Sequence, residues 1–192
     1  MGASLVISLF YMGVAYLIAS PNVSEEYHNY YIKRNTSDWR PAKYSGSIRE
    51  GFDFSRAGQP DFIQATMGLS SLERGGRWTD ARLAPFAKIT YQEPSSGELC
   101  WILHAVAGRA SNAKQVIVRL GSEEKRFITD TDKPQWYALD FRLESPAKTI
   151  EIEPSAFETV FGRYYRKIAL GLYHLIIIPG KCADTEIHLS KK

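Results

Sequence analysis

The sequence is poor in the residues that carry most catalytic and metal chemistry. It has two cysteines, four histidines and three methionines in 192 residues. Cys100 and Cys182 form no C-x-x-C pair and have no histidine at zinc-ligand spacing, which argues against a zinc site. Nucleophile-elbow, Walker, zinc-protease and dinucleotide-binding motifs do not occur. We therefore expect no metal and no cofactor, and we assign no catalytic residue.

A surplus of charge of one sign is also lacking. The formal net charge is +3, and basic residues are interspersed with acidic ones. A nucleic-acid partner is not expected, because phosphate binding needs a concentrated basic face. With 44% hydrophobic and 23% charged residues, the composition is that of a folded chain rather than a disordered one.

An uncharged, apolar segment from Ala3 to Ala19 opens the chain. At about 1.5 Å per residue its length is at the short end for crossing a bilayer, and Pro21 ends it. The pattern predicts an uncleaved transmembrane anchor at 1–21, in contact with lipid through residues 3–19. A cleaved signal peptide and a buried core helix are the alternatives. The polar, aromatic residues 22–46 are predicted to form a juxtamembrane stalk.

Short segments with strand-like patterns follow at intervals of about ten residues. In one of them, Val116, Val118 and Leu120 occupy every second position. Turns rich in glycine, proline, serine and asparagine separate the segments. The pattern predicts an all-β domain at 47–192, a jelly-roll-like β-sandwich. Its expected strands are 47–54, 61–67, 86–92, 99–107, 115–120, 125–129, 135–141, 149–153 and 168–178.

The two cysteines allow two interpretations. In an oxidising compartment Cys100 and Cys182 could form a disulfide that closes a long loop, which stabilises a fold by roughly 4 kcal/mol in the chain-entropy model. They could equally be two buried thiols. The sequence leaves both open.

The densest run of unusual residues is 68–80, between two expected strands. Its glycines permit a tight backbone, and its other side chains include two carboxylates, a guanidinium and an indole. Proteins hold sugars with such groups, because the indole stacks on the sugar ring and charged groups bond to hydroxyls. We interpret the run as a glycan-binding loop in which two acids orient the arginine. The alternative is structural: the arginine pairs with Glu73, and the indole plugs one end of the sandwich. The loop-shaping residues are Gly68, Gly75 and Gly76, and the expected contacts are Glu73, Arg77, Trp78 and Asp80.

A second cluster lies at 157–165, before the last expected strand. Arg163 and Tyr164 are further candidate glycan contacts there, since binding surfaces favour arginine and aromatic residues. The alternative is a solvent-facing loop that caps the sheet. His104 and His174 lie on expected strands without a paired acid, and we interpret both as structural.

The motif Gly68-Leu69-Ser70, Glu73, Gly76-Arg77-Trp78-Thr79-Asp80 resembles the C-terminal β-sandwich of phosphoglycerol transferase I, which decorates periplasmic glucans. It is also similar to sandwiches appended to membrane glycosyltransferases, and the resemblance extends from about Gly51 to Ile178. The resemblance implies a β-sandwich that works beside a transferase. Gly75 stands where the family usually has an aromatic residue. The family's alkaline-phosphatase-like catalytic domain has no counterpart here, so its reaction is not expected.

These observations predict a membrane-tethered, non-catalytic accessory domain. It would bind an envelope glycan, of the periplasmic-glucan or O-antigen type, or present it to a membrane-bound glycosyltransferase or phosphoglycerol transferase. A structural module of such a complex and a small glycan-modifying transferase are the alternatives. The resemblance and the cysteine pair favour a single-pass protein of the bacterial inner membrane, with its soluble domain in the periplasm.

Overall fold

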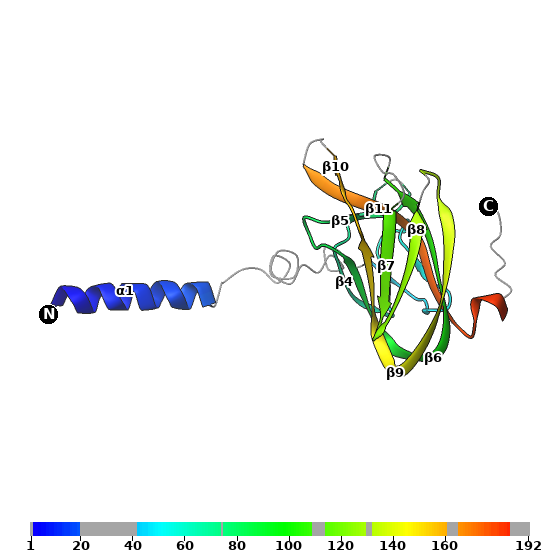
Figure 1. Ribbon diagram of the computed structural model, residues 1–192. Coiled ribbons are helices and arrows are strands. Elements are labelled where there is room, and N and C mark those ends of the chain that lie inside the picture. The colour runs from blue at the N-terminus through cyan, green and yellow to red at the C-terminus, as the bar shows by residue number, and fades with distance from the viewer. Residues whose placement is uncertain are drawn as a thin grey trace.

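A computed structural model describes residues 2–19, 42–73, 75–108, 114–129, 132–160 and 165–184. One α-helix precedes a domain built almost entirely of strands (Figure 1). The predicted all-β class is confirmed, and so is a sandwich-like fold. The elements are α1 (Gly2–Ala19), β1 (Lys43–Tyr44), β2 (Phe52–Asp53), β3 (Gln59–Pro60), β4 (Ile63–Met67), β5 (Arg77–Asp80), β6 (Ala87–Ala107), β7 (Lys114–Leu120), β8 (Glu123–Thr129), β9 (Gln135–Pro154), β10 (Glu158–Val160), β11 (Arg166–Pro179) and the 3-10 helix η3 (Cys182–Asp184).

Nine of these strands form one sheet that folds over into two layers. The main path runs β10-β11-β6-β9-β7-β8, with β2 and β5 on β11 and β4 on β6. The first layer contains β4, the start of β6, the end of β9, β7 and β8. The second layer contains the rest of β6 and β9 with β11, β2, β5 and β10. The short strands β1 and β3 pair separately, in parallel.

The two long strands β6 and β9 belong to both layers. Ile89 pairs with Ile150 in the first layer, and Trp101 pairs with Leu139 in the second. The ladder between them continues through register shifts around Ser95. The sequence predicted four separate strands here, at 86–92, 99–107, 135–141 and 149–153, which is wrong. Because both strands bend side by side, their hydrogen bonds continue from one layer to the other, towards the lower end of the domain in Figure 1.

Alternation along the strands places the core between the layers. In β6 every second residue from Leu99 to Ala105 is buried in the core, so the residues between them lie on the outer face of the second layer. In β11 the core residues are Leu170 and Leu172 and then Leu175 and Ile177. A register shift just after Leu172 moves the inward positions by one residue. The consecutive side chains of Tyr173 and His174 in β11 therefore both lie on the outer face.

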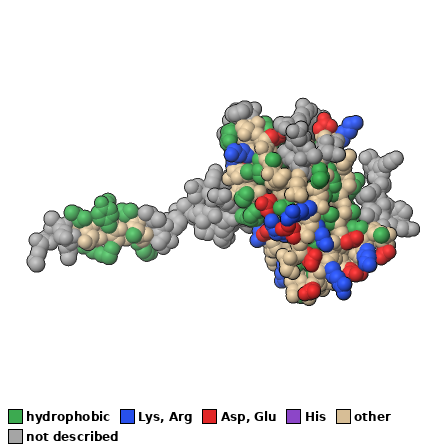
Figure 2. Space-filling view, in the orientation of Figure 1, with side chains coloured by type: hydrophobic (Ala, Val, Ile, Leu, Met, Phe, Trp, Pro, Cys, Tyr) green, Lys and Arg blue, Asp and Glu red, His purple; other side chains and the backbone are tan. Residues whose placement is uncertain are grey.

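The outer face of the first layer is charged. Figure 2 shows acidic and basic side chains next to one another over β7 to β9. Arg119 bonds to Glu124 at 3.0 Å, Arg126 bonds to Glu124 at 2.8 Å, and Lys88 bonds to Glu151 at 3.0 Å. Surface pairs of this kind stabilise a fold by less than about 1 kcal/mol each, so this face mainly provides solubility.

The N-terminal helix α1 carries the apolar segment, and most of its described side chains are exposed, with Phe10 66% and Tyr16 70% accessible. Within the described residues, no helix has the length and apolar character needed to cross a membrane. The predicted transmembrane anchor is therefore not supported. A helix of 18 residues rises only about 27 Å, against a hydrocarbon core of about 30 Å. Most of the predicted stalk lies outside the described residues.

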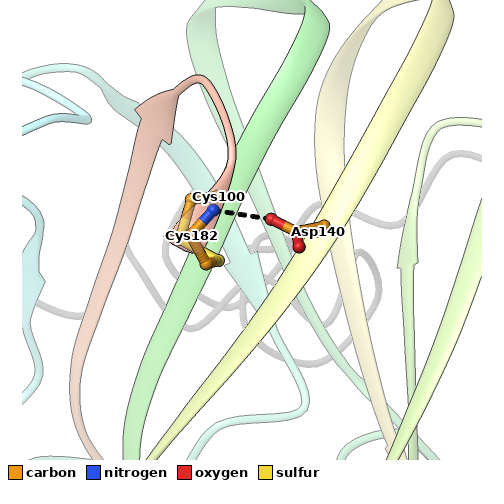
Figure 3. The surroundings of a disulfide bond; sticks show 3 residues. All are labelled: Cys100, Asp140 and Cys182. Carbon is orange, nitrogen blue, oxygen red and sulfur yellow. Dashed lines mark hydrogen bonds between the residues drawn. A yellow bond between two sulfur atoms is a disulfide. The ribbon is translucent and has the colours of Figure 1, made fainter. Parts of the chain in front are cut away.

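A disulfide joins Cys100 of β6 to Cys182 of η3, with a Cα–Cα distance of 4.8 Å (Figure 3). Cys100 is fully buried on the outer face of β6. The backbone N–H of Cys182 donates to Asp140 Oδ1 of β9 at 2.7 Å. The chain after β11 is thus fixed across two strands of the second layer, and of the two interpretations of the cysteines the structure has the disulfide.

Opening the disulfide is expected to cost much of the stability of the domain. The double variant Cys100→Ser, Cys182→Ser removes a bond across a sequence separation of 82 residues, so the unfolded chain gains entropy corresponding to roughly 4.5 kcal/mol. Urea unfolding followed by tryptophan fluorescence measures the loss. The control is the unchanged protein with and without dithiothreitol. If neither the double substitution nor dithiothreitol lowers the unfolding midpoint, the stabilising role of the disulfide is contradicted.

Candidate functional site

Residues 68–73 and 75–80 pair as the two arms of a β-hairpin rather than forming the predicted loop. Ser70 N–H donates to the Trp78 carbonyl at 2.8 Å, and Asp80 N–H donates to the Gly68 carbonyl at 2.9 Å. Reciprocal backbone bonds between Glu73 and Gly76 close the turn. The second strand of the hairpin, β5, pairs with β11, and the Thr79 hydroxyl accepts from Leu170 N–H at 3.0 Å. The motif is therefore part of the second layer.

Gly68 is the position where the hairpin needs glycine most. Its φ of 73° lies in the left-handed region. A Cβ atom there would lie 2.0 Å from the Phe86 carbonyl oxygen. The start of the hairpin therefore approaches the backbone before β6 more closely than any side chain allows.

Arg77 points into the domain. Its guanidinium donates to the Gly58 carbonyl at 3.3 Å and to the Ser70 carbonyl at 3.5 Å. Burial lowers the pKa of this guanidinium below its usual value, and nearby Tyr44 opposes the shift. Among the described residues, no carboxylate pairs with Arg77. Its bonds to two carbonyls tie the hairpin to the chain around β3, which is a structural role.

The two acids of the motif pair with an arginine that the sequence did not connect to them. Arg166 Nη2 lies 2.7 Å from Glu73 Oε1, an ion pair without the angle of a hydrogen bond. Arg166 Nε lies 3.7 Å from Asp80 Oδ2, and Arg82 Nη2 lies 3.3 Å from the same oxygen. Asp80 is only 2% exposed. The predicted orientation of Arg77 by Glu73 and Asp80 is therefore wrong, as is a pair between Arg77 and Glu73.

Trp78 is the one motif side chain with a flat surface, and it lies on the outer face of the second layer. It is half-buried and stands opposite Gly171 of β11. A Cβ atom on Gly171 would lie 3.2 Å from Trp78 Cζ2 and 3.3 Å from Cη2. The indole therefore lies over the bare backbone of Gly171, which holds the ring in place and leaves part of it accessible.

Gly75, at the turn of the hairpin, also lies on this face. A Cβ atom on Gly75 would lie 3.2 Å from Tyr173 Cε1, and its φ is 91°. A residue with a side chain here would crowd the edge of the tyrosine ring. Glycine in this position therefore avoids crowding Tyr173, which stays partly exposed.

The structure thus separates the predicted site residues. Trp78 faces outward, while Glu73, Arg77 and Asp80 hold the hairpin in place. Arg163 and Tyr164 lie outside the described residues. Sequence reasoning missed Gly171 and Arg166, because only the pairing of β5 with β11 brings them to the motif. The one available signal was that both stand on the last expected strand or directly before it.

Two other features could hold a small ligand. A hollow of about 340 Å³ is lined by Arg49, Asp61, Phe62 and Gln92, among others, and none of the predicted site residues lines it. Cys100, Asp140 and Cys182 place ligand-type atoms within 4.8 Å of one another. Both sulfurs are in the disulfide, and Asp140 accepts the N–H of Cys182, so this group offers no thiolate for a metal.

Comparison with known proteins finds one matching family model and similarity to transferases. The family model described as Domain of unknown function (DUF7024) matches residues 40–179. Phosphoglycerol transferase I of Escherichia fergusonii is 28% identical over 134 residues, which cover 67% of this chain and 17% of the relative. The Citrobacter koseri protein of the same name is also 28% identical, and that of Salmonella choleraesuis is 27% identical, with the same coverage. The match thus spans about a sixth of the length of these relatives.

Among solved structures, the fold is similar to a mutant of a carbohydrate binding module of family 29. The TM-score is 0.43 and the identity is 14%, over 70% of this chain and 94% of that chain. A likeness of this size carries no inference about ligands.

Removing the side chain of Arg166 is expected to destabilise the domain. Arg166→Met leaves the buried Asp80 with fewer cationic partners and Glu73 with none of those described, at a cost of about 2 kcal/mol. The matched control is Arg126→Met, whose partner Glu124 is on the exposed charged face, with an expected loss below about 1 kcal/mol. The free energies of unfolding of both variants are measured with urea. Equal losses in the two variants would contradict the structural role of Arg166.

Gly68 and Gly97 offer a second matched pair. Both have positive φ, at 73° and 77°, so alanine costs about 1 kcal/mol at either position. No atom lies within 4 Å of a Cβ on Gly97, whereas a Cβ on Gly68 meets the Phe86 carbonyl. Gly68→Ala is therefore expected to lose about 2 kcal/mol more than Gly97→Ala in thermal or urea unfolding. Similar losses would mean that the close approach of the hairpin does not limit this position.

Proposed function

This chain belongs to the family described as Domain of unknown function (DUF7024), and we propose that its domain is an accessory module that binds a glycan. The observation that carries the proposal is the position of Trp78. Its indole lies against Gly171 on the outer face of a sheet, while the charged residues of the same motif pair with other groups of the domain. A fixed, half-exposed ring on a flat face suits stacking against the apolar side of a sugar ring.

The similarity to phosphoglycerol transferase I supports a role beside a transferase. Because the aligned segment is 17% of that relative, we do not carry its reaction over to this chain. We propose instead that the domain holds an envelope glycan, such as a periplasmic glucan or an O-antigen chain. The enzyme that it serves would be a phosphoglycerol transferase or a glycosyltransferase, on the same polypeptide or on another.

The disulfide supports a location outside the cytoplasm. Disulfides persist in oxidising compartments such as the bacterial periplasm and are rare in the cytosol. The bond between Cys100 and Cys182 fixes the end of the domain across β6 and β9, so the folded form benefits from an oxidising environment. We propose that the domain works in the periplasm, where envelope glycans are found.

The proposal predicts that Trp78→Ala weakens glycan binding at least tenfold, because the stacking surface is lost. Isothermal titration of the intact chain with a linear gluco-oligosaccharide measures the effect. Trp78→Phe keeps a flat ring and is expected to retain most of the affinity.

Ile128→Ala is the control for this measurement. Ile128 is 61% exposed on β8, in the other layer, and its removal is expected to leave binding unchanged. The thermal unfolding midpoint of each variant shows whether the fold is intact. Equal affinity of the folded Trp78→Ala variant and the unchanged protein would refute the site.

A further inference from the structure

Four aromatic rings gather on the outer face of the second layer, outside the sequence motif. His104 of β6 stacks on Trp136 of β9, with ring centroids 4.5 Å apart and planes at 12°. His104 also lies 5.1 Å from the ring of Tyr173, and Trp136 lies 6.4 Å from that of His174. We call these four residues the ring cluster.

The strand geometry explains why all four rings face outward. His104 stands between the core residues Leu103 and Ala105 of β6, so it points to the opposite side. Tyr173 and His174 are neighbours in sequence, and two neighbours on a regular strand would face opposite ways. The register shift in β11 between Leu172 and His174 places both on the outer face.

The ring cluster is held in place and partly exposed. Trp136 is 39% exposed, although an indole is a large apolar group that is usually buried in a core. His174 Nε2 lies 3.1 Å from the Glu50 carbonyl, which anchors that ring. Burial, together with nearby His174, holds the pKa of His104 below its usual value near 6.5, so its imidazole is neutral at neutral pH. No lysine, arginine or acid belongs to the cluster.

The ring cluster continues to Trp78. Tyr173 borders Gly75 of the hairpin, and Gly171 and Val106 fill the sheet face beside the Trp78 indole. Trp78, Tyr173, His104 and Trp136 lie on the adjacent strands β5, β11, β6 and β9. At about 4.8 Å between neighbouring strands, the rings cover roughly 14 Å. This span is longer than a single sugar ring.

We propose that the ring cluster and Trp78 form one platform that binds an extended, uncharged glycan segment across the strands, with several consecutive sugar rings in contact. This inference rests on the proposed function. The chemistry of the two outer faces favours it: the first layer presents paired charges, while this face presents flat rings with polar edges. A neutral polyol chain matches rings that offer an apolar surface and ring nitrogens or hydroxyls.

The test is a titration of the intact chain with glucose and with linear gluco-oligosaccharides of increasing length. For the unchanged protein, affinity is expected to rise with length until the platform is covered. Trp136→Ala is expected to bind the longest ligand about tenfold more weakly and the shortest with unchanged affinity. Trp136→Phe keeps a ring and is expected to recover most of the length dependence.

The outcomes separate this inference from the proposed function. If Trp78→Ala loses binding while the folded Trp136→Ala variant matches the unchanged protein at every length, the extended platform is wrong and the single site stands. If the unchanged protein binds no oligosaccharide, both are wrong. If instead a second copy of the chain covers the platform, analytical ultracentrifugation would show a dimer. A dimer would also overturn the inference.

A measurement on the unchanged protein covers the case in which Trp136→Ala does not fold. The indole N–H signals of Trp78 and Trp136 are followed by NMR during titration with the longest ligand. Both are expected to shift, whereas that of the fully buried Trp101 is expected to stay in place. A shift of the Trp78 signal without one of Trp136 refutes the extended platform.

Discussion

The ladder of β11 is the constraint on which the rest of the second layer depends. One edge of this strand bonds to β6, and β2, β5 and β10 also pair with it. Residues that are far apart in the sequence meet because each has a fixed partner on this strand. The register shift after Leu172 then decides which side chains face the core. If the shift were absent, Leu175 and Ile177 would face solvent, so the burial of these residues and the outward position of Tyr173 and His174 are two results of one backbone irregularity.

The charged residues of the motif illustrate how a pattern typical of binding also serves folding. Asp80 is almost fully buried, and a buried carboxylate needs cations close to it. Arg166 and Arg82 provide them, so the carboxylates of the motif already have cationic partners within the domain. Arg77 donates from its two terminal nitrogens to two carbonyl groups. What remains for a ligand is the face of Trp78, and the function that we propose relies on stacking rather than on charge.

The two layers differ in what they present to solvent. The first carries salt bridges within and between its strands, which keep the sheet soluble and offer little to an uncharged ligand. The second carries rings and is crossed at one end by the disulfide-linked η3. The disulfide fixes the C-terminal segment over β6 and β9 away from the rings, since Cys100 pairs with Asp140 across the ladder while His104 pairs with Trp136. The exposed rings are therefore left to the part of the face nearer the hairpin.

The sequence by itself determined the class of the domain and most of its strands. Alternation in Val116, Val118 and Leu120 is local, and local patterns are readable without a fold. It did not determine that β6 and β9 continue through their proline-containing bends, because a strand that changes layers needs a partner that bends with it. Only the tertiary structure decided that Arg166, not Arg77, pairs with the acids of the motif, and that His104 stacks on Trp136. Both depend on strand pairing between distant segments, in which a shift of one residue reverses the face of every side chain.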